Sequence, residues 1–67
     1  MSTTPVHAMD LNGLRPGDRL EAFRDGYVHH RGVVEETVPD LGVVWVRATG
    51  TGERHMVTTA DFELRRG

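Results

Sequence analysis

Closely spaced turn signals are the feature of this sequence that most constrains its fold. Pro, Gly, Asp and Thr cluster at four places typical of tight turns, namely residues 16–18, 25–26, 39–42 and 49–52. The segments between and after these turns have the two-residue alternation or β-branched content of strands, at residues 19–23, 27–36, 43–48, 53–58 and 62–65. No stretch has a sustained helical period, and residues 58–61 alone predict one short helical turn. The sequence therefore predicts an all-β chain.

Five short strands joined by tight turns leave sheet edges that must be paired or covered. A strongly bent sheet achieves this, and we predict a five-stranded SH3-like small β-barrel at residues 14–66. Gly32, midway along the longest predicted strand, is the expected place for a bend or bulge. Residues 1–13 lack a strand or helix period and predict a flexible N-terminal arm. Met9, Leu11 and Leu14 are nevertheless able to fold back onto the barrel.

The composition limits what stabilises such a domain. The chain has 67 residues and no cysteine, so its core is thin and neither a disulfide nor a thiolate metal site is available. Its formal charge is −2, which disfavours sequence-independent binding to nucleic acid. All eight basic residues are arginine, a bias typical of GC-rich bacterial genomes. No apolar run is long enough to cross a bilayer, and residues 1–10 lack signal-peptide character. We therefore expect a bacterial, cytoplasmic protein with no membrane contact.

The order of short motifs resembles a Tudor-type domain, and agenet and other SH3-like modules of the same group are similar. The matching segments are, in chain order, PGDRLEAF, DG, HRGVVEE, VVWVRATGTGERHMV and TTADFEL. The resemblance covers roughly residues 14–65. The resemblance implies a small barrel that works as a binding module.

Tudor-type domains that read methylated lysine or arginine do so with an aromatic cage, because a weakly hydrated cation binds well against several π faces. The corresponding positions in this chain hold Arg24, His30, Arg47 and Thr51. A one-residue shift in the first hairpin brings in Phe23 or His29 without completing a cage. The resemblance therefore implies the fold and a binding role, but not recognition of methylated side chains.

Trp45 is the most informative single residue for function. If Val44 and Val46 face the core, the two-residue period of a strand turns Trp45 outward, where tryptophan is a frequent contact for a protein partner. The alternative, left open here, is that Trp45 is a core residue or is covered by the arm. The residues predicted to contact a partner protein are Trp45, Phe23, Tyr27, His30 and Arg47.

Catalytic and metal chemistry find little support in the sequence. His29 and His30 are neighbours, which on a regular strand point to opposite faces and cannot bind one metal ion together. His30 can meet His55 across the barrel, but no third ligand is evident. The one serine lies in the arm, and residues 35 and 36 are adjacent carboxylates that diverge on a strand. We therefore predict no catalytic residue, no metal and no cofactor.

Two alternatives to a protein-binding module follow from other features. A face made by Arg24, Arg31 and Arg47 beside the aromatic residues would bind nucleic acid. The neighbouring acids favour instead ordinary cross-strand ion pairs for these arginines. A small accessory or inhibitory subunit, whose arm becomes ordered on its target, is the third hypothesis. The leading hypothesis is a non-enzymatic module that binds another protein, and the sequence leaves its oligomeric state open.

Overall fold

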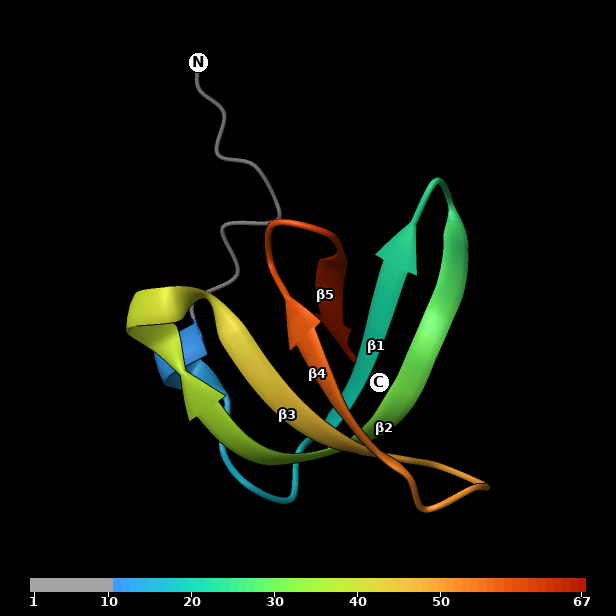
Figure 1. Cartoon of the computed structure of the whole chain (residues 1–67), viewed down its shortest axis with the longest axis horizontal. Helices are drawn as coiled ribbons and strands as arrows, with labels where there is room; N and C mark the ends of the chain where they lie inside the picture. Colours follow the sequence, from blue (N-terminus) through green and yellow to red (C-terminus); the bar gives the residue numbers. More distant parts are fainter. Residues whose placement is uncertain (1–10) are drawn as a thin grey trace.

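A computed structural model describes residues 11–67, apart from the side chain of Asn12. Two short 3-10 helices and five strands make up this part of the chain (Figure 1). In chain order they are η2 (Leu11–Gly13), β1 (Arg19–Arg24), β2 (Tyr27–Val38), η3 (Pro39–Leu41), β3 (Val43–Ala48), β4 (Arg54–Thr58) and β5 (Glu63–Arg66). None of the helices described here has the length and apolar character needed to span a membrane.

The five strands form one antiparallel sheet in the order β4-β3-β2-β1-β5. The long strand β2 pairs with β1 through residues 27–33 and with β3 through residues 32–38. Figure 1 shows β2 curving away from the β1–β2 hairpin, so that the sheet wraps around its own core. This arrangement is the predicted all-β, SH3-like small barrel, and each of the five predicted strands is present with ends that move by no more than two residues.

The core is made of aliphatic side chains from every strand and from the segment before β1. Alternation along β3 places Val44 and Val46 inward, with exposed fractions of 0% and 2%. The other buried hydrophobic residues are Leu11, Leu14, Leu20, Ala22, Val34, Val57 and Leu64. Leu11 lies in η2, so residues 11–13, predicted as part of a flexible arm, here form a 3-10 turn that packs on the barrel. Met9 and the rest of the predicted arm, residues 1–10, lie outside the described residues.

Gly32 is not itself the site of a bulge. The two irregularities of the sheet ladder lie on either side of it, between Ala22 and Phe23 on β1 and between Val34 and Glu36 on β2. At Gly32 itself the β3 backbone approaches so closely that a Cβ atom would overlap the carbonyl oxygen of Arg47. Glycine is needed here for close strand packing, and the two bulges lie on either side of it.

Two turns position the side chains at the open end of the barrel. Asp25 and Gly26 both have positive φ angles, 54° and 83°, as expected for the tight hairpin that the Asp-Gly pair predicts. After β4, the amides of Asp61 and Phe62 both donate to the carbonyl of Thr58, at 3.2 and 3.1 Å. This is the predicted single helical turn. It places Phe62 where its ring packs against the core.

Candidate functional site

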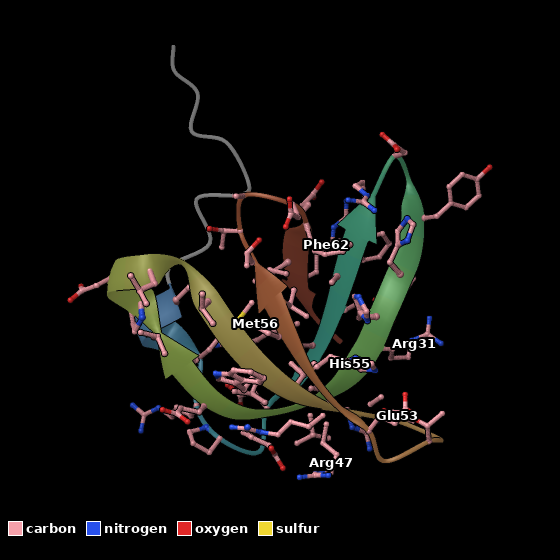
Figure 2. All side chains as sticks on the ribbon, viewed as in Figure 1. Arg31, Arg47, Glu53, His55, Met56 and Phe62 are labelled. Atoms are coloured by element: carbon pink, nitrogen blue, oxygen red, sulfur yellow. The ribbon has the colours of Figure 1, made fainter. Side chains whose placement is uncertain are left out.

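Trp45 lies on the outer face of the sheet. Its neighbours Val44 and Val46 are buried, and Trp45 is half-buried on the opposite side of β3. Met56 on β4 is its direct cross-strand partner and is 53% exposed. We call this surface the Trp45 face and define it by Val33, Glu35, Trp45, Arg47, Arg54 and Met56. Figure 2 shows Arg47 projecting outward from this side of the sheet.

Ion pairs hold the charged side chains of the Trp45 face in place. The Arg54 guanidinium lies over the indole ring, 4.2 Å from its centroid, and its Nε donates to Glu35 at 3.0 Å. Arg47 donates to the other oxygen of the same carboxylate at 2.6 Å. Arg47 and Arg54 are direct cross-strand partners, so Glu35 separates two like charges. The hydrogen bond from Arg47, assisted by Arg54, lowers the pKa of Glu35 despite its partial desolvation.

The other predicted contact residues lie elsewhere. Phe23 pairs with Val28 and Trp45 with Glu36, which are eight positions apart on β2. At the usual rise of a strand this separates them by roughly 25 Å along the bent chain. Tyr27 is 73% exposed beside the hairpin turn, at the same end as Phe23. The structure therefore brings Trp45 and Arg47 together on one face, but it does not bring Phe23 and Tyr27 to them.

His30 belongs to a second group of side chains, on the inner side of the sheet. Its ring lies 5.1 Å from the His55 ring, as predicted, and 5.2 Å from the ring of Phe62. The His29 ring is 5.8 Å from Phe62, and the Arg24 guanidinium lies 5.0 Å from the centre of the same ring. We call this group the mouth cluster and define it by Arg24, His29, His30, His55 and Phe62. Figure 2 shows His55 and Phe62 in the space between β4 and β1.

The mouth cluster corrects the prediction that His29 and His30 point to opposite faces. The ladder pairs Ala22 with His30 and Phe23 with Val28, so His29 is the extra residue of a bulge. A bulge breaks the two-residue alternation locally, and both imidazole rings contact Phe62 as a result. Even so, residues 11–67 hold no group of three His, Cys, Asp or Glu side chains arranged to bind a metal ion.

The surroundings of His30 disfavour its charged form. Burial lowers the pKa of His30, and the nearby His55, His29 and Arg24 lower it further. Its partner ring on β4 has a different neighbour, because His55 Nε2 lies 3.5 Å from a carboxylate oxygen of Glu53. At neutral pH the imidazole of His30 is therefore uncharged, in contact with two other aromatic rings.

This lowered pKa predicts that acid destabilises the fold. The unfolded chain binds a proton at this site at a higher pH than the folded chain, so the free energy of unfolding falls as the pH drops below about 6.5. Thermal melts across the range between pH 5 and 8 are expected to show this decline in the wild-type protein and a flatter profile in His30→Gln. The Glu35 carboxyl acts in the same direction at lower pH, because its lowered pKa contributes stability that is lost only as the pH falls below about 4.5. If the melting temperatures of the two proteins fell equally with decreasing pH, the loss of stability could not be assigned to His30.

The three arginines of the predicted nucleic-acid face each contact different side chains. Arg31 is in an ion pair with its cross-strand partner Glu21 at 2.9 Å, and Arg47 is in one with Glu35. Arg24 lies over Phe62 in the mouth cluster. Two of the three are thus in the ordinary cross-strand pairs that the acids of the sequence favour, and the three do not form one basic surface.

Sequence reasoning did not single out Arg54, Met56 or Phe62. The alternation of β4 did place Arg54 and Met56 on one face, but their contact with Trp45 depends on the register between β3 and β4. The position of the Phe62 ring depends on the turn after β4, which directs it toward residues far away in the sequence.

Comparison with known proteins gives no relative from which a function can be transferred. No family model matches the chain, and no curated protein or solved structure matches it significantly. Function must therefore be inferred from the Trp45 face and the mouth cluster.

Proposed function

We propose that this chain is a non-enzymatic, Tudor-like binding module of the bacterial cytoplasm, which binds another protein through the Trp45 face. The observation that carries the proposal is the position of Trp45 outside the core, with the exposed Met56 directly opposite on β4. Tryptophan and arginine are the residue types most enriched among energetically dominant contacts in protein interfaces. A methionine beside them supplies an apolar surface that adapts to different shapes.

The charges of the Trp45 face favour a protein partner over nucleic acid. Glu35 accepts hydrogen bonds from both Arg47 and Arg54, so the two guanidiniums share one carboxylate. A carboxylate oxygen of Glu36 lies 3.8 Å from Nη2 of Arg54 and adds a second negative charge, so two acids face the two arginines. These pairs also hold the arginine side chains in place before a partner arrives, which reduces the entropy lost on binding.

The resemblance to Tudor-type domains supports a binding role without supplying a ligand. The positions that correspond to the aromatic cage hold Arg24, His30, Arg47 and Thr51, and a methylated cation has no set of π faces there. We therefore place the partner on the outer face of the sheet and do not propose that the chain reads methylated side chains.

A capture experiment with matched variants tests this proposal. The immobilised full chain, Trp45→Ala and a control variant, Arg15→Gln, are incubated with extract of the organism that encodes it, at low and at moderate salt. Arg15 is exposed, and its side chain makes none of the contacts of the Trp45 face. We expect one protein to be retained by the wild type and by Arg15→Gln at both salt concentrations, and to be lost with Trp45→Ala.

The same experiment identifies the alternatives. Capture of nucleic acid that disappears steeply as salt rises would contradict the proposal and favour the nucleic-acid hypothesis. Retention of the same protein by Trp45→Ala would also contradict it, because the partner would then occupy another surface. The captured protein is purified and mixed with the chain alone, so that only direct binding counts as support.

A further inference from the structure

Strand β4 is one edge of the sheet. It pairs with β3, and in the described part of the chain no strand pairs with its other side (Figure 1). The amide of Ala48 donates to the carbonyl of Glu53 at 2.7 Å, which marks these two as a hydrogen-bonded pair of the β3–β4 ladder. Hydrogen-bonded and non-hydrogen-bonded pairs alternate along an antiparallel ladder. The backbone N–H groups of Arg54, Met56 and Thr58 therefore point away from β3, toward the free edge.

The residues of β4 do not protect this edge. Natural sheets protect an exposed edge with a proline, a bulge or a projecting charge. β4 contains no proline, and its register with β3 has no shift over residues 54–58. Its one arginine, Arg54, lies back over the ring of Trp45 on β3 and is paired with Glu35, so its charge does not project from the edge. By contrast, three of the four residues of the other edge strand, β5, are charged.

We propose that β4 pairs antiparallel with β4 of a second copy of this chain, about a two-fold axis at Met56. The backbone N–H and C=O of Met56 bond to the same groups of Met56 in the second copy, and the amide of Thr58 donates to the carbonyl of Arg54 across the axis. The two sheets become one, and the two Trp45 faces become one outer surface to which each copy contributes half. This inference goes beyond the proposed function, because it requires no other protein.

The order of side chains along β4 favours this register. With the axis at Met56, Arg54 lies opposite Thr58 of the second copy, and His55 lies opposite Val57. No charged or titratable side chain of the strand then faces its own equivalent, which would be destabilising. An axis at Arg54 would place two arginines opposite each other, and an axis at His55 would do the same with two imidazoles. The strand is therefore self-complementary about Met56.

The charge and apolar character of the edge favour a second copy over a charged segment of another protein. Arg54 lies 3.0 Å from Glu35 and 3.8 Å from Glu36, so its charge is compensated within its own chain. Met56 is 53% exposed, and the axis places it beside Met56 of the second copy. Two copies thus cover an open edge and an apolar side chain on each other without burying an unpaired charge.

The pairing is expected to be reversible, because the interface is small. It joins five residues of each copy, which buries less than the roughly 1,000 Å² expected of a stable complex. The dimer therefore forms at high protein concentration and dissociates on dilution.

Sedimentation equilibrium and amide hydrogen exchange of the wild-type chain test the pairing. We expect the weight-average mass to rise from that of the monomer at about 10 µM toward that of the dimer at about 1 mM. In the same samples, the amides of Met56 and Thr58 are expected to exchange at least about threefold more slowly at the higher concentration. The amides of His55 and Val57, which bond to β3, are expected to exchange equally in both samples.

Disulfide cross-linking tests the register, because the chain has no cysteine of its own. In Met56→Cys the two Cα atoms at the axis are about 5.5 Å apart, within the range of a disulfide. In Arg54→Cys they are roughly 14 Å apart, because each lies four residues from the position opposite its equivalent. Tyr27→Cys, exposed at the hairpin end, measures cross-linking by random collision. We expect Met56→Cys to form a disulfide dimer at least about tenfold faster than both controls.

A proline at the axis tests the backbone hydrogen bonds. Met56→Pro removes an N–H group that β3 does not use, and an edge strand tolerates proline at such a position. We expect this variant to stay monomeric at about 1 mM, whereas Met56→Leu, which keeps the N–H group and an apolar side chain, associates like the wild type. Circular dichroism establishes that each variant is folded. If Met56→Pro is not, Met56→Lys takes its place, since it sets two like charges on the axis.

Three results would overturn this inference: a monomer mass at every concentration, equal exchange of the Met56 amide at the two concentrations, or equal cross-linking of Met56→Cys and Arg54→Cys. Association of a folded Met56→Pro as strong as that of the wild type would also overturn it, because the copies would then meet through another surface. A monomeric wild type removes this inference and leaves the capture experiment with Trp45→Ala unaffected.

Discussion

Gly32→Ala is expected to lower the free energy of unfolding by about 2–3 kcal/mol, which is most of the roughly 3–5 kcal/mol available to a domain of this size. The added Cβ would overlap the carbonyl oxygen of Arg47 and lie 3.1 Å from the Cα of Ala48. Both are backbone atoms of β3, so no side-chain rotation relieves the overlap and β2 must separate from β3. Urea denaturation followed by circular dichroism measures the loss.

Gly13→Ala is the matched control for this substitution. The nearest atom to a Cβ at Gly13 is the end of the Arg66 side chain, at 3.8 Å, which is ordinary contact with a flexible group. We expect a change within about 0.5 kcal/mol, as for a surface substitution without a special backbone role. Equal losses of unfolding free energy in the two variants would show that the close approach of β2 and β3 is not the reason that position 32 requires glycine.

Trp45→Ala is expected to weaken binding of the captured partner by at least about 30-fold, which corresponds to roughly 2 kcal/mol. The substitution removes the largest apolar side chain of the Trp45 face and the ring on which Arg54 lies. Arg54 then keeps its carboxylate contacts but loses the surface that fixes its orientation. Isothermal titration calorimetry with the purified partner measures the change, and thermal melts establish that the variant remains folded.

Tyr27→Ala serves as the aromatic control for the Trp45 substitution. Tyr27 is the more exposed of the two aromatic side chains, but it lies at the other end of β2, beside the hairpin turn. We expect its loss to change the affinity by less than about threefold, in line with substitutions outside the energetic centre of an interface. A larger effect from Tyr27→Ala than from Trp45→Ala would move the binding surface from the Trp45 face to the hairpin end.

Local patterns in the sequence were enough to predict the strands, but they left open whether Trp45 is a surface or a core residue. The two-residue period holds along β3, where Val44 and Val46 are buried and Trp45 is not. The turn residues bounded the strands correctly because Asp25 and Gly26 have the positive φ angles that this residue pair favours. The approach of His30 to His55 was identified as possible, since both lie on the inner phase of their strands.

The bulges and the contacts between side chains of different strands could not be predicted, because they depend on interactions between distant parts of the chain. The bulge at His29 is a property of the register between β1 and β2, and no local pattern marks it. The bulge at Glu35 likewise decides that one carboxylate reaches both Arg47 and Arg54. Leu11 and Leu14 were identified as able to fold back onto the barrel, and both are buried, but the 3-10 turn that carries Leu11 was not predicted. Periodicity identifies the two faces of a strand, but it does not show which side chains of neighbouring strands meet.

The Trp45 face and the mouth cluster lie on opposite sides of the sheet, so each can be altered by substitution without touching the other. Trp45 and Met56 are on the outer side, whereas His30 and His55 are on the inner side at the open end. A variant of one surface therefore leaves the contacts of the other in place.

The central claim is that Trp45 lies outside the core beneath Arg54, and its fluorescence tests this directly because it is the only tryptophan in the chain. The measurement is the emission maximum and acrylamide quenching of the wild type and of Arg54→Ala. We predict measurable quenching in the wild type, with a red shift and stronger quenching in Arg54→Ala, since removal of the guanidinium exposes the indole. A blue-shifted emission that resists quenching equally in both proteins would place Trp45 in the core and contradict the account.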